Sequence, residues 1–136
     1  MRVGVIADIH ANAVVFDTVV EALDRERLDT VLCLGDVALT GPQPRECIER
    51  LQEREWPTIM GNSDAAVLAP TLSEDLDEDS QRVEEIDFWC MEQLSASHRA
   101  YIATFKPVIE MDLVGVSLLA FHSRQEVTAI LSRRRH

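Results

Sequence analysis

The stretch "GVIADIHAN", residues 4–12, decides the fold, because an apolar run stops there at two polar residues, Asp8 and His10. Residues 2–7, "RVGVIA", are apolar and rich in β-branched side chains, which predicts a buried strand. A carboxylate and an imidazole at the end of such a strand are costly to bury without a partner. A metal ion is one partner that both can bind, so the stretch raises the hypothesis of a metal site at a strand end.

The chain that follows predicts an α/β domain. Val15, Val19 and Leu23 recur at helical spacing after Asn12, a suitable N-cap, and a second buried strand comes next. A strand, a helix and a second strand in this order predict a parallel pair. The first expected elements are a strand at 2–7, a helix at 12–26, a strand at 30–35, a helix starting at Pro44 and a short strand at 57–60.

The second half of the chain predicts helices and then antiparallel pairing. An apolar stripe predicts a helix from residue 81, and Ser95 is suited to cap a shorter helix that ends near Phe105. We expect His98 of this shorter helix to lie at the surface. Two apolar runs around Val114-Gly115 predict a hairpin. Without a linker or repeat, we expect one domain over residues 1–136, with a disordered basic tail at 132–136.

Composition narrows the function. The 136 residues are 46% hydrophobic and 27% charged, and the formal net charge is −11. Such an acidic protein is a poor partner for long nucleic acids or anionic membranes. The three cysteines have no C-x-x-C spacing, and no apolar run is long enough for a membrane span. We therefore expect a cytoplasmic protein, with the acidic stretch at 73–85 forming a solvated loop and helix start.

Polar side chains follow each predicted strand. They are Asp8 and His10, Asp36 after Gly35, Asn62 after Gly61, and His122. Ligand sites of α/β sheets collect at the carboxyl ends of the strands, so these side chains are expected to meet. Two carboxylates, an amide oxygen and two imidazoles suit Mn²⁺, Fe²⁺, Zn²⁺ or Co²⁺. An aspartate can bridge two such ions about 3.5–4 Å apart, a spacing that activates water and clamps a phosphate ester.

Four segments in this order resemble a known family. They are "ADIHAN", "LGDVALTGPQPREC", "MGNSDAAVLAP" and "LLAFHS". Together they resemble the calcineurin-like metallophosphoesterases, in particular the small bacterial and archaeal phosphodiesterases, over roughly residues 1–131. The resemblance implies a sandwich of mixed β-sheets flanked by helices.

The resemblance also implies roles for individual residues. Asp8, His10 and Asp36 would bind a first metal ion, and Asp36, Asn62 and His122 a second, with Mn²⁺ expected first and Fe²⁺, Zn²⁺, Ni²⁺ and Co²⁺ as alternatives. A hydroxide between the ions would attack phosphorus, with Asp36 and Asn62 as catalytic residues. Asn62 would also contact the substrate phosphate. Arg45 could reach that phosphate from the loop after the second strand, or lie at a solvated helix start.

Three departures from the family pattern qualify these expectations. Ser63 stands where many relatives have the histidine that protonates the leaving group. Ser123 follows His122 where relatives have glycine, and the chain ends without a Gly-His-x-His motif. We therefore expect a C-terminally truncated domain that lacks the last strands, and a homo-oligomer that covers the exposed sheet edge.

Two functions follow from these observations. The first is a metal-dependent hydrolase acting on a small phosphodiester or phosphomonoester. The alternative is a catalytically impaired or inactive remnant of the fold that binds metal or a phosphorylated ligand. A nucleotide-binding α/β domain is disfavoured, because Asp-Ile-His-Ala follows the first strand where a glycine-rich loop would stand.

Overall fold

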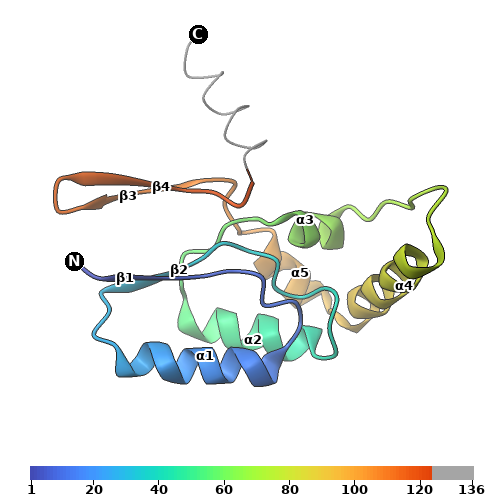
Figure 1. Cartoon of the computed structure of the whole chain (residues 1–136), viewed down its shortest axis with the longest axis horizontal. Coiled ribbons are helices and arrows are strands. Elements are labelled where there is room, and N and C mark those ends of the chain that lie inside the picture. Colours follow the sequence, from blue (N-terminus) through green and yellow to red (C-terminus); the bar gives the residue numbers. More distant parts are fainter. Residues whose placement is uncertain (124–136) are drawn as a thin grey trace, which may run out of the picture.

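The computed structural model describes residues 1–123 and consists of α/β layers (Figure 1). The elements are β1 (Val3–Ile6), α1 (Ala13–Arg25), β2 (Thr30–Cys33), α2 (Pro44–Arg54), α3 (Asn62–Leu68), α4 (Glu78–Gln93), α5 (Ala96–Ile102), β3 (Ile109–Leu113) and β4 (Val116–Ala120). The expected tail at 132–136 lies outside the described residues.

The parallel strand pair predicted from the sequence is confirmed. β1 and β2 pair in parallel, with Val3 beside Thr30 and Ile6 beside Cys33. The helix between them starts where expected, since the side chain of Asn12 accepts a hydrogen bond of 3.1 Å from the N–H of Val15. The two strands therefore end at the same edge of the sheet.

The strand expected at 57–60 is reduced to single bridges. Thr58 pairs with Cys33, and Ile59 pairs with Lys106, both in parallel. Pro57 has no N–H to donate at one end of this segment, and the chain turns at Gly61 at the other. The segment is therefore too short for a regular strand, although it still continues the sheet beyond β2.

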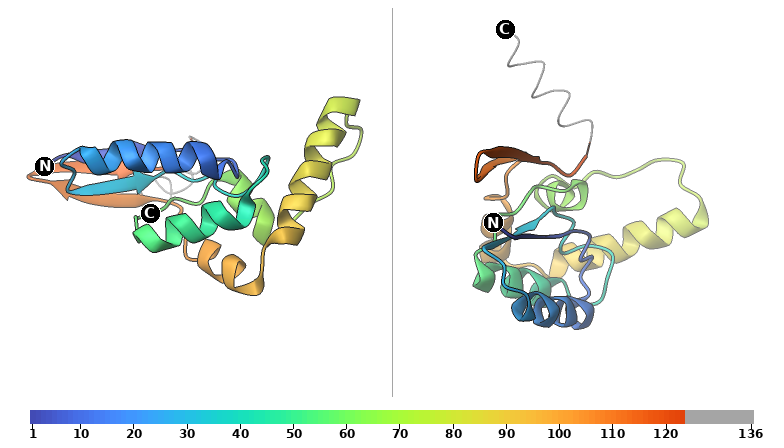
Figure 2. Two further views of the ribbon diagram at one scale, coloured as in Figure 1. Left: turned by 90° about the horizontal axis from the view of Figure 1, so that it is seen from below. Right: turned by 60° about the vertical axis from the view of Figure 1, so that its left-hand side comes forward.

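The layers form the expected sandwich. β3 and β4 form an antiparallel hairpin around Val114-Gly115, as predicted. Figures 1 and 2 show β1 and β2 between this hairpin on one side and helices α1 and α2 on the other. Leu32 of β2 packs with Ala120 toward the hairpin, whereas its neighbour Cys33 packs with Phe16 toward the helices. Alternation along one strand thus fills two apolar cores.

Two helices differ from the prediction in detail. α4 begins at Glu78 rather than 81, because Asp77 caps it by accepting a 2.7 Å hydrogen bond from the N–H of Ser80. The prediction that His98 lies at the surface is wrong, since this residue is only 9% exposed. Its Nδ1 lies 3.0 Å from the backbone nitrogen of Ser95, and its Nε2 lies 3.0 Å from a carboxylate oxygen of Glu49 on α2.

No helix within residues 1–123 combines the length and apolar character needed to cross a membrane.

The buried cysteines lead to a first prediction. Burial raises the pKa of the Cys33 and Cys47 thiols to about 12, and both side chains are fully buried. At pH 8 a thiol with that pKa is about one part in ten thousand thiolate, the form that reacts with electrophiles. We expect iodoacetamide to leave both residues unmodified in the native protein and to label them in urea, as measured by peptide mass spectrometry. Rapid labelling of either residue without urea would contradict this packing.

Candidate metal centre

The loops after β1 and β2 run side by side beyond the strands. The N–H of Asp8 donates to the carbonyl of Gly35 at 3.0 Å, and the N–H of His10 donates to that of Asp36 at 3.0 Å. Asp8, His10 and Asp36 all have left-handed backbones, with φ of 57°, 46° and 60°. That conformation is uncommon for residues other than glycine and tends to cluster at functional sites.

Two glycines allow the loop after β2 to touch the chain before α3. Gly35 has φ of 93°, and a Cβ there would lie 2.6 Å from the backbone nitrogen of Gly61. A Cβ on Gly61 would lie 2.2 Å from Oδ1 of Asp36. Both positions exclude any larger residue. This close approach brings Asn62, the first residue of α3, to the same edge as Asp36.

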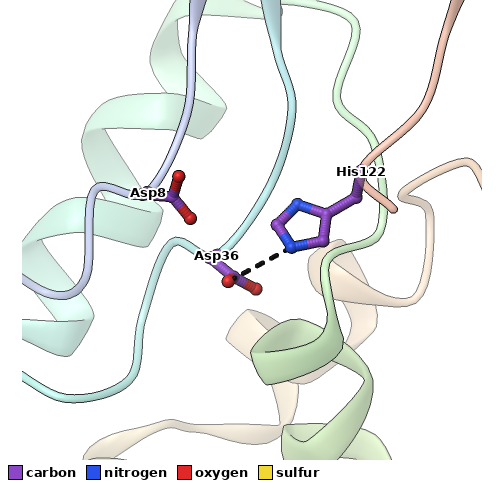
Figure 3. A group of neighbouring side chains, drawn as sticks. All are labelled: Asp8, Asp36 and His122. Atoms are coloured by element: carbon purple, nitrogen blue, oxygen red, sulfur yellow. Dashed lines mark ion pairs between the residues drawn. The ribbon is translucent and has the colours of Figure 1, made fainter. Parts of the chain in front are cut away.

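The structure brings the five predicted side chains together. Oxygen or nitrogen atoms of Asp8, Asp36 and His122 all lie within 4.8 Å of one another (Figure 3). His10 Nε2 lies 3.6 Å from Asp8 Oδ1 and 3.8 Å from Asp36 Oδ2. His122 Nε2 lies 3.3 Å from the same Asp36 oxygen and 3.1 Å from Asn62 Oδ1. Two groups of three side chains therefore share one oxygen, Oδ2 of Asp36.

Both histidines are oriented by backbone carbonyls. Nδ1 of His10 lies 3.1 Å from the carbonyl oxygen of Leu39, and Nδ1 of His122 lies 2.6 Å from that of Leu34. A carbonyl oxygen can only accept, so Nδ1 of each ring carries the proton. In the neutral ring the lone pair is then on Nε2, which faces carboxylate and amide oxygens. This orientation is the one used by histidines that bind metal ions.

The chemistry of these groups fits a cation. Within residues 1–123, the basic side chains within 4 Å of the Asp8 and Asp36 carboxylates are the imidazoles of His10 and His122, and no lysine or arginine forms an ion pair with either carboxylate. Lone pairs and negative charge thus face one another around Asp36, which is only 5% exposed. Metal–ligand bonds of about 2.0–2.2 Å place neighbouring ligand atoms roughly 3–3.5 Å apart, close to the spacings observed here. Nitrogen and oxygen donors together suit the borderline divalent ions.

Ser63 holds the other oxygen of Asp36. Its backbone N–H donates to Oδ1 at 3.0 Å, and its hydroxyl donates to the same atom at 2.9 Å. Oδ2 is thereby left to face the histidines. Ser63, which stands where the resemblance implies a histidine in many relatives, therefore positions the central carboxylate, a role that the sequence alone did not indicate.

Asp64 is a residue that the sequence reading missed. Its carboxylate is 1% exposed and accepts hydrogen bonds from the N–H groups of Asp36, Val37 and Gly61 at 2.8, 3.0 and 2.8 Å. Burial raises the pKa of the Asp64 carboxyl, although the three N–H donors act in the opposite direction. An acidic residue three positions after the N-cap of a helix is a capping signal, which could have identified the bond to Gly61 but not the other two.

Within residues 1–123, Arg45 forms no ion pair with Asp8 or Asp36. It is exposed, as the second residue of α2. It does not line the cavity that His10, Asn62 and Ser63 share with α4. Its contact with a substrate phosphate therefore remains a prediction from the sequence alone.

The fold and the site define an α/β domain with a candidate metal centre at the carboxyl ends of its parallel strands. A model of the calcineurin-like phosphoesterase superfamily domain matches residues 1–136, and the chain belongs to this superfamily. The resemblance drawn from the four sequence segments is thus confirmed.

Individual relatives match most of this chain. An uncharacterised protein from Methanocaldococcus jannaschii is 24% identical over 121 residues, which are 89% of this chain and 49% of that protein. A crystal structure of a metallophosphoesterase from Sphaerobacter thermophilus is 34% identical with a TM-score of 0.64, covering 82% of this chain and 44% of that one. A hypothetical protein from Pyrococcus horikoshii, at 18% identity and a TM-score of 0.65, shares the fold over 86% of this chain and 52% of its own. The chain spans about half the length of these relatives.

The position of Ser63 leads to a second prediction. Changing Ser63 to alanine removes the hydroxyl bond to Asp36 but keeps the backbone bond. We expect Mn²⁺ affinity, measured by isothermal titration calorimetry, to fall about tenfold, as is typical when a hydrogen-bond partner of a metal ligand is lost. Ser97→Ala, at an exposed position of α5, is the matched control. Equal Mn²⁺ affinity of the two variants and the unmodified protein would show that the hydroxyl has no such role.

Proposed function

We propose that this chain is a metal-dependent hydrolase that acts on a small phosphodiester or phosphomonoester. The observation that carries the proposal is the convergence of Asp8, Asp36 and His122, with His10 and Asn62 completing two groups around one oxygen of Asp36. Membership in a superfamily of phosphoesterases supports the type of reaction.

The residues divide into two sets that would each hold a divalent ion, with Mn²⁺ the first to test. Asp8 and His10 form one set and Asn62 and His122 the other, and Asp36 belongs to both. Bound divalent ions supply a water of lowered pKa and neutralise the charge that develops on the phosphate oxygens. The protein supplies the arrangement, because Ser63 and two backbone carbonyls hold the side chains in place.

The side chains of the site also determine which leaving groups the substrate can have. The Ser63 hydroxyl donates to Asp36, and its pKa is far from neutrality, so it cannot act as the acid that protonates the leaving group. We therefore expect esters of acidic alcohols, which leave readily as anions, to be hydrolysed faster than alkyl esters.

The test is hydrolysis of bis(p-nitrophenyl) phosphate by the purified chain. We expect release of nitrophenolate that requires Mn²⁺, stops with EDTA and returns when Mn²⁺ is added in excess. A rate equal to that of Mn²⁺ in buffer would overturn the proposal and favour the alternative, a domain that binds metal without catalysis. Calorimetric titration with Mn²⁺ then distinguishes a binding remnant from a chain that binds no metal.

A further inference from the structure

A cavity of about 350 Å³ lies next to the candidate metal centre. His10, Asn62 and Ser63 line one end, and residues of α4 and of the loop before it line the other. The volume is in the lower part of the range of small-molecule sites. The cavity therefore shares His10 and Asn62 with the candidate metal centre, and it offers space beside any phosphate bound there.

Helix α4, which forms the wall of the cavity opposite the candidate metal centre, is hydrogen-bonded to the loop that carries Asp36. The hydroxyl of Thr40 donates to Oδ1 of Asp87 on α4 at 2.7 Å, and the thiol of Cys90 donates to the carbonyl of Gly41 at 3.2 Å. Thr40 and Gly41 belong to the same loop as Asp36. Helix α4 is therefore positioned relative to the metal centre by direct contacts, and its side chains form a defined wall.

The lining combines apolar and hydrogen-bonding groups. Leu39, Phe88 and Met91 supply apolar surface. Thr71 and Ser73 supply polar groups on the loop before α4, and Glu84 and Asp87 supply two carboxylates. Among the described residues that line the cavity there is no lysine or arginine. Such a lining accepts hydrogen bonds from hydroxyl or amino groups and repels a second anion.

We propose that this cavity holds an uncharged organic group of the substrate, one that has hydroxyl donors and an apolar part and is the size of a nucleoside. The ester then carries one phosphate, because a second phosphate in the cavity would face Glu84 and Asp87. This inference rests on the proposed phosphoesterase function. It adds which organic group of the ester the site accepts, a property that the metal-binding residues do not determine.

Three substrates with the same leaving group test the inference. They are methyl p-nitrophenyl phosphate, thymidine 5′-(p-nitrophenyl phosphate) and the 3′-phosphorylated form of the latter. With Mn²⁺ we expect kcat/KM for the thymidine ester to exceed that for the methyl ester at least about tenfold, and the 3′-phosphate to remove most of this gain. Equal values for the three esters would overturn the inference and leave the phosphoesterase function standing.

A charge reversal in the cavity tests whether its carboxylates cause the discrimination against the 3′-phosphorylated ester. Glu84→Lys should raise kcat/KM for the 3′-phosphorylated ester relative to the thymidine ester at least about tenfold. Glu92→Lys makes the same change at an exposed position of the same helix that does not line the cavity, and should leave the ratio unchanged. Ratios are compared within each variant, so differences in metal loading cancel. An unchanged ratio in Glu84→Lys would contradict the assignment.

A binding measurement separates this inference from the function on which it rests. Thymidine is titrated into ¹⁵N-labelled protein without metal, beside thymidine 3′,5′-bisphosphate. We expect thymidine to shift the amide signals of residues 71–91. The bisphosphate should shift the same signals less at equal concentration. If no ester is hydrolysed but thymidine binds there, the function fails and the cavity assignment stands. If thymidine shifts no signal in this segment, the cavity assignment fails.

Discussion

Changing Asp36 to asparagine is expected to abolish Mn²⁺-dependent hydrolysis of bis(p-nitrophenyl) phosphate. Oδ2 of Asp36 is the atom that both groups of side chains share, 3.8 Å from His10 Nε2 and 3.3 Å from His122 Nε2. Loss of a hydrogen-bond partner of a metal ligand costs about 10–100-fold in affinity or activity, and loss of the shared ligand's charge should cost at least about 100-fold.

The same change should leave the fold intact. The asparagine oxygen can still accept the two hydrogen bonds from Ser63, and the backbone bonds of residue 36 do not change. Calorimetric titration with Mn²⁺ should show the loss of binding, and circular dichroism should show an unchanged spectrum. The control is Asp79→Asn, since this side chain on α4 is 93% exposed. Retention of Mn²⁺-dependent hydrolysis by the Asp36 variant would rule out the proposed centre.

Changing Asp64 to alanine is expected to cause the largest loss of stability of any substitution proposed for this protein. Three backbone N–H groups, those of Asp36, Val37 and Gly61, would lose their acceptor in a buried position. Leaving a buried donor unsatisfied costs about 1–3 kcal/mol, so the loss of three acceptors should lower the free energy of unfolding by at least about 3 kcal/mol. The loops that carry Asp36 and Asn62 would also separate.

Urea unfolding followed by circular dichroism measures this loss. Asp64→Asn keeps one acceptor oxygen and should lose less than the alanine variant. Should the alanine variant fail to fold, amide exchange of Val37 in Asp64→Asn provides the second measurement, and faster exchange there is expected. A decrease of less than about 1 kcal/mol in the alanine variant would mean that water replaces the carboxylate and that Asp64 is not essential to the two loops.

Local signals in the sequence predicted most of the elements. The cap at Asn12, Pro44 at the start of α2 and the turn at Val114-Gly115 were confirmed, because each depends on residues within a few positions along the chain. The differences have two sources. His98 is buried with its Nε2 3.0 Å from Glu49 of another helix, a contact between segments that are distant in the sequence. The short segment at 57–60 and the earlier start of α4 depend on local features that the periodicity did not include, namely Pro57, the turn at Gly61 and the cap at Asp77.

The candidate site shows the same division. Asp8, His10, Asp36, Asn62 and His122 could be selected from the sequence, because each polar residue follows an apolar run and the carboxyl ends of strands meet at one edge. That Ser63 donates to Asp36 could not be predicted, since the two residues belong to different loops. The spacing along the chain contains no information about which oxygen of Asp36 faces the histidines.

By itself, the sequence determined the α/β class, the order of the strands and the set of polar residues at their ends, since periodicity and local capping depend on neighbours in the chain. Only the tertiary structure decided how those residues are oriented. The carbonyls of Leu34 and Leu39 set the two imidazoles, and Asp64 ties the loop of Asp36 to that of Gly61. Such contacts form when the sheet brings loops together across long sequence separations, and hydrogen bonding of the buried polar groups then selects a single arrangement.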